Sequence, residues 1–286
     1  MRFWKFQGLG NDYVLLDATR QAVEVDSEAV RRICTRRFGV GADGLLVVER
    51  SSVADFRMRI FNADGTEAEM CGNGIRCVAK YVYEHRLTEK TKLSIETLAG
   101  VKRLVLTVNS GKAVRIGVYM GSPQLKRGKI PMLGPPEETC IEEAVEVDGE
   151  KLKITCVSMG NPHAVVFVDK IKKADVIRIG RRLERHKLFP KGTNVEFLRT
   201  ISPTSAEMQV WERGVGYTLA CGTGACAAAV AGAITGRLKV GENLAIHMPG
   251  GVLTIRVEEN LQDIYMEGPV EEVFEGVLSV AVLKGP

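Results

Sequence analysis

The chain has 286 residues, a formal net charge of +4 at pH 7, and 45% hydrophobic against 26% charged residues. This composition is typical of a folded globular protein and excludes a disordered or collagen-like chain, and the length favours about two domains. The mild charge, the absence of a signal-peptide pattern at Met1 and the seven scattered cysteines predict a cytoplasmic protein with reduced thiols and no nucleic-acid or membrane partner.

The first half reads as strands with two helices. Asp26 and Ser27 could cap a helix that runs to about Arg37. A second helix is predicted from near Gly72 to Arg86, because apolar residues recur there every three or four positions. Strands are predicted where β-branched and apolar residues gather, at 13–18, 44–49, 56–62, 92–98, 103–108 and 113–120.

The second half repeats this plan. Strands are predicted at 164–169, 194–199 and 207–211, with a helix near Asp175 to Lys187 between the first two. A further helix begins at Gly222 and consists almost entirely of small residues. Small side chains on all sides predict a helix buried inside a sheet or barrel.

The two halves are related by an internal duplication. An offset of 150 places Cys71 on Cys221, Gly10-Asn11 on Gly160-Asn161 and Phe61-Asn62 on Trp211-Glu212. Such self-similarity predicts an α+β fold of two pseudo-symmetric lobes, each a mostly antiparallel sheet or barrel around a central helix. We place the first lobe at 1–120 and the second at 121–271, and expect the C-terminal strand at 272–286 to return to the first lobe.

Each lobe begins a helix with a cysteine followed by Gly-x-Gly. A helix amino terminus favours negative charge and can lower a cysteine pKa from about 8.5 to about 3.5–7.5. The glycines leave the first-turn N–H groups open to a ligand carboxylate. The alternative is a buried structural cysteine, but two copies in register favour a functional thiol.

Two other uses of the cysteines fit less well. The spacings Cys71–Cys77 and Cys221–Cys226 exceed those of most structural zinc sites, and Cys77 and Cys226 are interpreted as packing residues inside the helices. A Cys-His hydrolase with His163 as base would not explain the second thiol. Equivalent thiols suit inversion of a stereocentre, in which one group removes a proton from one face and the other delivers a proton to the opposite face.

Several stretches carry a family resemblance. The motifs "GLGNDYVLLD", "FNADGTEAEMCGNGIRC", "MGNPHAVVFVD", "GTNVEF", "WERGVGYTLACGTGACAA" and "MPGG" resemble those of the diaminopimelate epimerase family, over residues 3 to about 276. The resemblance implies a cofactor-independent isomerase, without a metal, that converts LL-2,6-diaminopimelate to the meso form with Cys71 and Cys221 as the catalytic residues.

The resemblance also implies a substrate-binding set. His163 and Glu212 are candidates for tuning the thiols, and the chain departs from some members of the family by having Gly44 where they have Gln. The polar side chains and helix-start amides expected to hold the zwitterionic substrate are those of Asn11, Asn62, Gly72, Asn73, Asn161, Asn194, Glu212, Arg213, Gly222 and Thr223.

Other functions stay open at this point. A proline-type racemase or a phenazine-pathway isomerase of the same superfamily would share the fold, and a non-catalytic protein could clamp an amino acid between two lobes without needing the cysteines. The expected partner is the small molecule diaminopimelate, and a homodimer is kept open because the sequence does not fix the oligomeric state.

Overall fold

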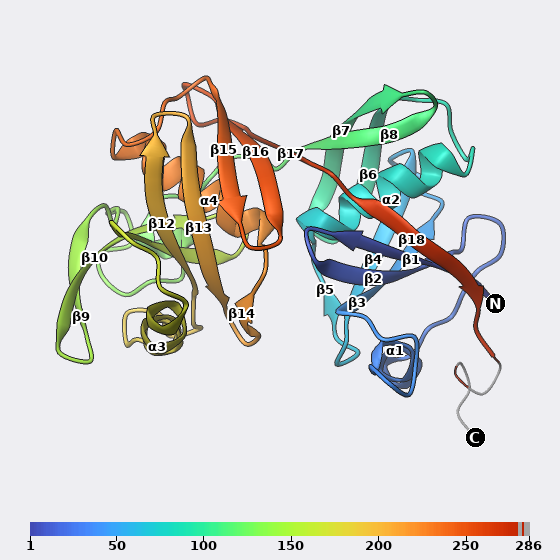
Figure 1. The fold of residues 1–286 in the computed structure, drawn as a ribbon, viewed down its shortest axis with the longest axis horizontal. Coiled ribbons are helices and arrows are strands. Elements are labelled where there is room, and N and C mark those ends of the chain that lie inside the picture. The colour runs from blue at the N-terminus through green and yellow to red at the C-terminus, as the bar shows by residue number, and fades with distance from the viewer. Residues whose placement is uncertain (280–281, 283–286) are drawn as a thin grey trace. The chain divides into compact units, whose positions relative to one another are not determined.

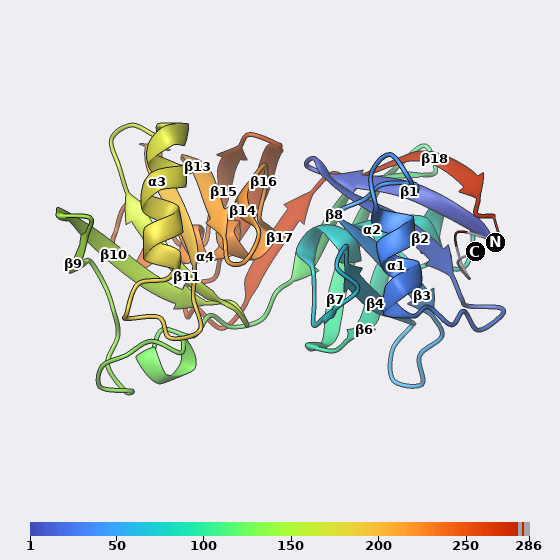
Figure 2. The same cartoon turned by 90° about the horizontal axis from the view of Figure 1, so that it is seen from below.

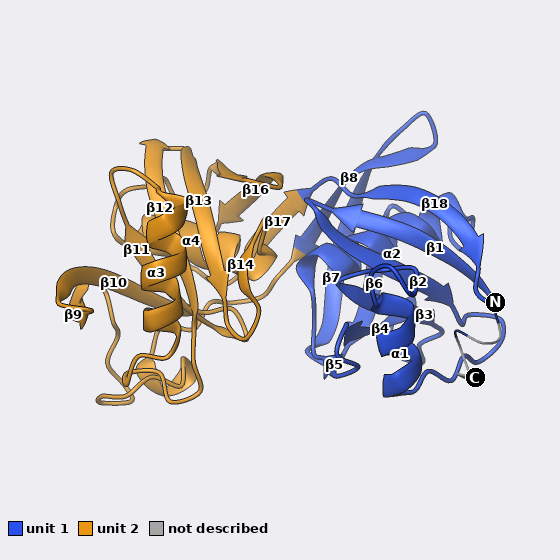
Figure 3. Ribbon diagram, turned by 60° about the horizontal axis from the view of Figure 1, so that its bottom comes forward, with its two compact units in different colours: residues 1–118, 268–286 blue, residues 119–267 orange. Residues whose placement is uncertain are grey.

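The computed structural model describes residues 1–279 and 282, and the chain divides into two compact units. Lobe 1 comprises residues 1–118 and the segment from 268 onward, and lobe 2 comprises residues 119–267 (Figure 3). Within the C-terminal segment that we expect to return to lobe 1, residues 280, 281 and 283–286 lie outside the described residues.

Lobe 1 is one mixed sheet that curves around a helix (Figure 1). Its strands pair in the order β18-β1-β2-β3-β4-β6-β7-β8, and the short β5 pairs with β4. All of these pairs are antiparallel except β2–β3 and β4–β6. The elements of lobe 1 are β1 (Arg2–Gly8), β2 (Asn11–Asp17), α1 (Ser27–Cys34), β3 (Gly44–Glu49), β4 (Phe56–Asn62), β5 (Glu67–Ala68), α2 (Gly72–Glu84), β6 (Lys92–Thr97), β7 (Gly100–Asn109), β8 (Lys112–Tyr119) and β18 (Glu271–Val277).

Lobe 2 has the same topology. Its strands pair in the order β9-β10-β11-β12-β13-β15-β16-β17, with β14 on β13, and its parallel pairs β11–β12 and β13–β15 correspond to those of lobe 1. The matching order and strand directions confirm the α+β fold and the duplication. The elements of lobe 2 are η1 (Arg127–Lys129), β9 (Glu143–Val147), β10 (Glu150–Ser158), β11 (Pro162–Phe167), α3 (Lys173–Glu184), β12 (Asn194–Ser202), β13 (Ser205–Glu212), β14 (Gly216–Thr218), α4 (Gly222–Ile234), β15 (Asn243–Met248), β16 (Gly251–Val257) and β17 (Ile264–Gly268).

One helix lies inside each lobe and one outside. The inner helices α2 and α4 contact strands from much of their sheets, whereas α1 packs on β3 and α3 packs on β12 and β13 from the other face (Figure 2). The strands that lie between the inner and the outer helix of each lobe are covered on both faces, which explains their continuous apolar runs. The small residues of α4 allow close approach: a Cβ on Gly232 would lie 2.6 Å from Leu238 Cδ1. No helix in the described residues has the length and apolar character needed to cross a bilayer.

The outer helices differ somewhat from the sequence prediction. Helix α1 is capped by Asp26, whose carboxylate accepts a 2.6 Å hydrogen bond from the Ala29 N–H, as expected. It ends at Cys34 rather than at about Arg37, because Thr35 adopts extended backbone angles and the Gly41 N–H bonds back to the carbonyl of Ile33. Helix α3 covers Lys173–Glu184, so it begins and ends slightly earlier than predicted.

The parallel strand pairs place polar residues at one end of each sheet. In lobe 1 the register pairs Tyr13 with Gly44, and Gly44 in turn with Asn62. In lobe 2 the equivalent register pairs His163 with Asn194. The site residues of each lobe therefore come from strand ends and from the start of the inner helix.

Candidate functional site

In lobe 1 Cys71 is the N-cap residue of α2. Its backbone is extended, with φ −139° and ψ 124°, and its Sγ accepts a hydrogen bond from the Gly74 N–H at 3.4 Å. The N–H groups of Gly72 and Asn73 point out of the first turn, where a helix offers them no acceptor. A Cβ on Gly74 would lie only 2.9 Å from Leu46 Cδ2, so this glycine lets the helix start close against β3.

Strand β2 places Tyr13 against the Cys71 thiol and Asn11 beside Tyr13. The Tyr13 hydroxyl lies 2.9 Å from Cys71 Sγ and also donates to Asn11 Oδ1. Asn11 Oδ1 is 3.5 Å from the Asn73 Nδ2, which reaches it from the first turn of α2. Tyr13 is 3% exposed, and burial, followed by the neighbouring Cys71, raises the pKa of its phenol well above the usual value. Its hydroxyl is therefore protonated at any working pH.

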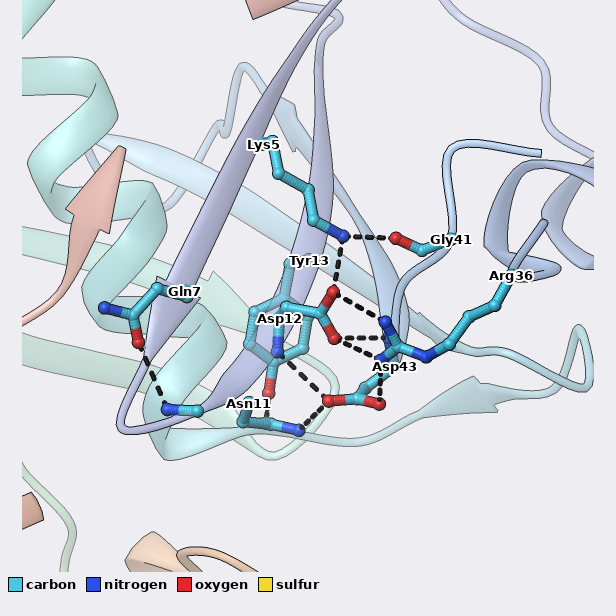
Figure 4. Close-up of polar contacts among 9 residues, drawn as sticks. Lys5, Gln7, Asn11, Asp12, Tyr13, Arg36, Gly41 and Asp43 are labelled. Atoms are coloured by element: carbon cyan, nitrogen blue, oxygen red, sulfur yellow. Dashed lines mark hydrogen bonds and ion pairs between the residues drawn. The ribbon is translucent and has the colours of Figure 1, made fainter. Parts of the chain in front are cut away.

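An ionic cluster supports this end of β2 (Figure 4). Asp12 pairs with Lys5 at 2.5 Å and with Arg36 at 2.6 Å, and Arg36 also contacts Asp43 at 2.9 Å. Asp43 in turn accepts from Asn11 Nδ2 at 3.0 Å. Burial alone would raise the pKa of Asp12, but the hydrogen bonds from Arg36 and Lys5 lower it to about 2. The cluster fixes the orientation of the Asn11 amide.

In lobe 2 Cys221 caps α4 in the same way. Its backbone angles are φ −130° and ψ 116°, and its Sγ accepts from the Gly224 N–H at 3.4 Å. The Thr223 hydroxyl lies 3.5 Å from the sulfur. A Cβ on Gly224 would lie 2.7 Å from Glu196 Oε1, so this glycine admits an acidic side chain where Gly74 admits a leucine.

A buried chain of hydrogen bonds runs beneath Cys221. His163 Nδ1 lies 2.7 Å from Glu196 Oε1, and neither side chain has any exposed surface. On its other side His163 Nε2 is 2.9 Å from Asn161 Oδ1, and Asn161 Nδ2 donates to Thr223 Oγ1 at 3.3 Å. The chain thus connects Glu196 to the residue that contacts the Cys221 sulfur.

The electrostatics of Cys221 differ from the sequence expectation. Burial raises the pKa of Cys221 well above its usual value, and the charges of Glu212 and Glu196 act in the same direction. The hydrogen bonds from Thr223 and Gly224 oppose the shift without reversing it. The expectation that the helix start lowers the thiol pKa is therefore wrong for Cys221, because desolvation and two nearby acids outweigh the helix terminus.

Glu212 also lies beside this thiol. Its Oε1 accepts from the Thr218 hydroxyl at 2.5 Å. Burial raises the pKa of Glu212, although the hydrogen bonds from Thr218 and Cys221 partly oppose this. The pKa values of Glu212 and Cys221 are both raised, so this part of lobe 2 favours the protonated form of each group.

Known proteins share both the sequence and the fold. The family model described as diaminopimelate epimerase matches residues 3–126 and 155–273. A diaminopimelate epimerase of Acetivibrio thermocellus is 50% identical over 277 residues, covering 96% of this chain and 98% of its own. One of Methanococcus maripaludis is 47% identical over 280 residues, covering 98% of this chain and 100% of its own.

The chain belongs to the diaminopimelate epimerase family. Epimerases are isomerases, and the chain is therefore an isomerase. Its fold is also that of a hydroxyproline epimerase from Agrobacterium vitis, with a TM-score of 0.72 at 14% identity over 100% of this chain and 97% of the other. At that identity the likeness shows the shared architecture alone.

The hydrogen bonds of the structure connect some residues of the diaminopimelate epimerase motifs to the cysteines. The sets Asn11–Asn73–Cys71 and Asn161–Thr223–Cys221 lie at the two helix starts. Asn62 instead bonds the Thr66 hydroxyl at 3.0 Å. 

Two further residues of this epimerase family signature lie around one amide. Asn194 donates to the Pro162 carbonyl at 2.9 Å and accepts from the Arg213 N–H at 2.9 Å. The Arg213 guanidinium bonds the Lys191 carbonyl at 3.3 Å. Asn194 therefore holds the backbone of Arg213, and the guanidinium lies at the surface of lobe 2.

Four residues around the epimerase thiols were not anticipated from the sequence, namely Tyr13, Asp43, Glu196 and Thr218. The offset of 150 offers a signal for the first, because it places Tyr13 on His163. The same offset places Glu196 on the apolar Leu46, so an acid stands where the other half has a core residue. The same offset places Gly44 on Asn194, and a Cβ at Gly44 would lie 2.6 Å from the Phe61 carbonyl oxygen.

The remaining cysteines of this epimerase lie away from the helix starts. All seven belong to the described residues and none forms a disulfide. Cys77 and Cys226 are completely buried on α2 and α4. Among the described residues no group of three or more His, Cys, Asp or Glu side chains could hold a metal ion.

Proposed function

We propose that this isomerase converts LL-2,6-diaminopimelate to meso-2,6-diaminopimelate, with Cys71 and Cys221 as its two acid–base groups. The observation that carries the proposal is the repeated helix start, in which each lobe aims a cysteine sulfur and the first-turn N–H groups from the same backbone geometry. Family membership supplies the substrate class.

In the proposed step the α-carbon of the substrate loses one proton and gains another. A thiolate in one lobe removes the α-hydrogen as a proton, leaving the electron pair on the α-carbon, where the adjacent carboxylate delocalises it. The thiol of the other lobe then delivers its proton to the opposite face. The first cysteine ends as a thiol and the second as a thiolate, so the roles are exchanged for the reverse reaction. This mechanism requires both sulfurs to reach one α-carbon from opposite sides.

The substrate contacts are assigned by charge. The N–H groups at the two helix starts suit an α-carboxylate, which gains charge as the proton leaves. The carbonyl oxygens of Asn11 and Asn161 suit the α-ammonium group, and Glu212 and Arg213 add a charge of each sign.

We further propose that the enzyme works in the cytoplasm. The mechanism needs both thiols reduced, and the unbridged cysteines support a reducing compartment. A homodimer stays a prediction, which sedimentation or light scattering of the purified protein would check.

The decisive experiment follows the reaction in D₂O. Protein dialysed against a chelator, with no added cofactor, is incubated with LL-diaminopimelate. The isomers are then separated, and the deuterium content of each is measured by mass spectrometry. The proposal predicts meso product carrying deuterium at the inverted centre, while substrate recovered early carries little, because one thiol removes hydrogen and the other delivers a solvent-derived deuteron.

Other outcomes would contradict the proposal. No product, or activity only after adding pyridoxal phosphate or a divalent ion, would reject cofactor-independent epimerisation of this substrate. Inversion of proline in place of diaminopimelate would indicate a proline-type racemase. Equal deuterium in early substrate and product would indicate one base rather than two.

A further inference from the structure

The Tyr13 hydroxyl lies between the sulfur of Cys71 and an amide oxygen. It is 2.9 Å from Cys71 Sγ and bonds Asn11 Oδ1 on the other side. The ring belongs to β2 and is 3% exposed, so water does not compete freely for the hydroxyl. A phenol has one proton and two lone pairs, and it can therefore donate to only one of these neighbours at a time.

We propose that Tyr13 is a positioning residue that holds Cys71 in both of its protonation states by turning its O–H bond. When Cys71 is a thiolate, the phenol donates to the sulfur. When Cys71 is a thiol, the S–H group donates to the phenol oxygen and the phenol proton turns to Asn11 Oδ1. Each proton stays on its own residue, so Tyr13 takes no part in proton transfer. The inference rests on the proposed function, in which Cys71 alternates between these states.

The surroundings keep the second acceptor in place. Asn11 presents its oxygen to Tyr13 because its Nδ2 is engaged by Asp43 at 3.0 Å, and Asp43 is held by Arg36 at 2.9 Å (Figure 4). Without this anchoring, rotation of the amide would replace the acceptor by a donor and the alternate position of the phenol proton would be lost.

The charged and titratable groups around Tyr13 and Cys71 come from helix α2 and from the segment before β3. Asp43 precedes β3 and bonds Asn11, and Cys77 is buried on α2, six residues beyond Cys71. Arg76, also on α2, is fully buried and bonds Asn73 Oδ1 at 2.8 Å. Among the residues that the structure describes, the Tyr13 hydroxyl is the side-chain group in direct hydrogen-bond contact with Cys71 Sγ.

Lobe 2 does not repeat this arrangement. His163 occupies the position equivalent to Tyr13, but its two ring nitrogens bond Asn161 and Glu196. The sulfur of Cys221 contacts the Thr223 hydroxyl at the longer distance of 3.5 Å. The hydroxyl that can turn between a sulfur and an amide oxygen is therefore found at Cys71 and not at Cys221. It makes the environments of the two thiols chemically unequal.

The test measures the reactivity of Cys71 directly. In a Cys221→Ser background, the rate of Cys71 alkylation by iodoacetamide is followed against pH by peptide mass spectrometry. Tyr13→Phe should move the midpoint of that curve upward by about one to two pH units, the loss of one hydrogen bond to a charged group. The matched control is Tyr81→Phe on α2: this residue is as buried as Tyr13, its hydroxyl bonds Asp17 at 3.0 Å, and its loss should leave the midpoint unchanged.

A second measurement covers the case in which Tyr13→Phe does not fold. Replacing all tyrosines by 3-fluorotyrosine keeps the ring shape and makes the phenol a stronger donor, so the Cys71 midpoint should move downward. In Tyr13→Phe protein that does fold, the fluorinated tyrosines should have no such effect.

The outcomes separate this inference from the proposed function. An unchanged Cys71 midpoint in folded Tyr13→Phe, or in the fluorotyrosine protein, would overturn the role of Tyr13, whatever the enzyme turns over. The alkylation assay needs no substrate, so failure of the wild-type protein to epimerise diaminopimelate would reject the proposed function while leaving the Tyr13 measurement intact.

Discussion

Glu196 Oε1 lies 2.7 Å from His163 Nδ1, with both side chains wholly inside lobe 2. Its second oxygen, Oε2, has no hydrogen-bond partner among the described residues. Lobe 1 has Leu46 at the equivalent position and needs no acid there. A buried carboxylate with one unbonded oxygen is costly, so we infer that its place beside His163 serves the Cys221 half of the site.

The first prediction concerns this pair. Glu196→Gln keeps the side-chain shape but removes the charge, and should lower kcat by about 10–100-fold, the effect of losing one buried charged hydrogen bond. Because Glu196 acts through His163, KM should change much less than kcat. Glu196→Leu, which copies lobe 1, should be at least as inactive and also less stable to urea, because it leaves the buried His163 Nδ1 without its partner. A variant with normal kcat would show that His163 needs no orienting partner.

The second prediction concerns the cysteines. Cys71→Ser and Cys221→Ser should each lower kcat by about 10²–10⁴-fold or more, because a serine hydroxyl is a much poorer base. Cys77→Ser and Cys226→Ser, on the packed sides of the same helices, serve as controls and should retain most activity in their folded fraction. Circular dichroism checks the fold of all four. Near-normal turnover without either Cys71 or Cys221 would contradict the two-base mechanism.

The third prediction uses the pKa of Glu212, which burial raises. The folded protein then binds this proton more tightly than the unfolded chain does, so stability falls as pH rises from the ordinary glutamate pKa through the raised one. Glu212→Gln should match the wild type in free energy of unfolding near pH 4 and exceed it at pH 8, while losing activity. Urea titrations at both pH values check this, with Glu207→Gln on the same strand as a control. Equal stability at pH 8 would argue against the raised pKa.

The fourth prediction concerns Asp12, whose pKa is lowered to about 2. A lowered carboxyl pKa contributes stability above the ordinary value of 3.8, and that contribution is lost as pH falls toward 2. Asp12→Asn should therefore reduce the free energy of unfolding by about 2 kcal/mol at pH 7, and the difference should shrink toward pH 2. Asp175→Asn, at a half-exposed carboxylate paired with Arg178 on the surface, should cost less than about 0.5 kcal/mol. A difference that does not depend on pH would show that the Asp12 charge is not its source.

The fifth prediction concerns the substrate. Lysine lacks the distal carboxylate of diaminopimelate, and each partner left unpaired in the complex should cost about 1–3 kcal/mol. Competition between the two amino acids should therefore give a kcat/KM for lysine at least ~10-fold lower. Comparable values would mean that the distal end is not recognised.

The sequence was most informative where the duplication repeats a motif. Cys71 and Cys221 stand in register within long matching stretches, and the starts of the two inner helices were predicted from that. The end of α1 was harder to predict, because the helix stops at Cys34 when the chain beyond Thr35 folds back onto the carbonyls of its last turn.

The parts of the site that the sequence did not reveal are those in which the halves differ. Tyr13 lies in an apolar strand and reads as a core residue, since nothing nearby in the sequence shows that its hydroxyl meets a sulfur. Glu196 lies in a similar strand, and its burial depends on Gly224, a contact far apart along the chain. The raised pKa of Cys221 likewise depends on acids that only the fold brings close.

Because of strand β18, the two lobes complete their sheets at different times during synthesis. Lobe 2 has its outer strand β9 immediately before β10, so all of its sheet is contiguous in the chain. In lobe 1 the strand that corresponds to β9 is β18 (Glu271–Val277), which pairs with β1. At typical translation rates the ribosome needs roughly 8–30 s to pass from the end of β8 to β18. The amino-terminal half, although made first, exposes an open sheet edge until the last residues emerge, and it is the second half that can finish folding earlier.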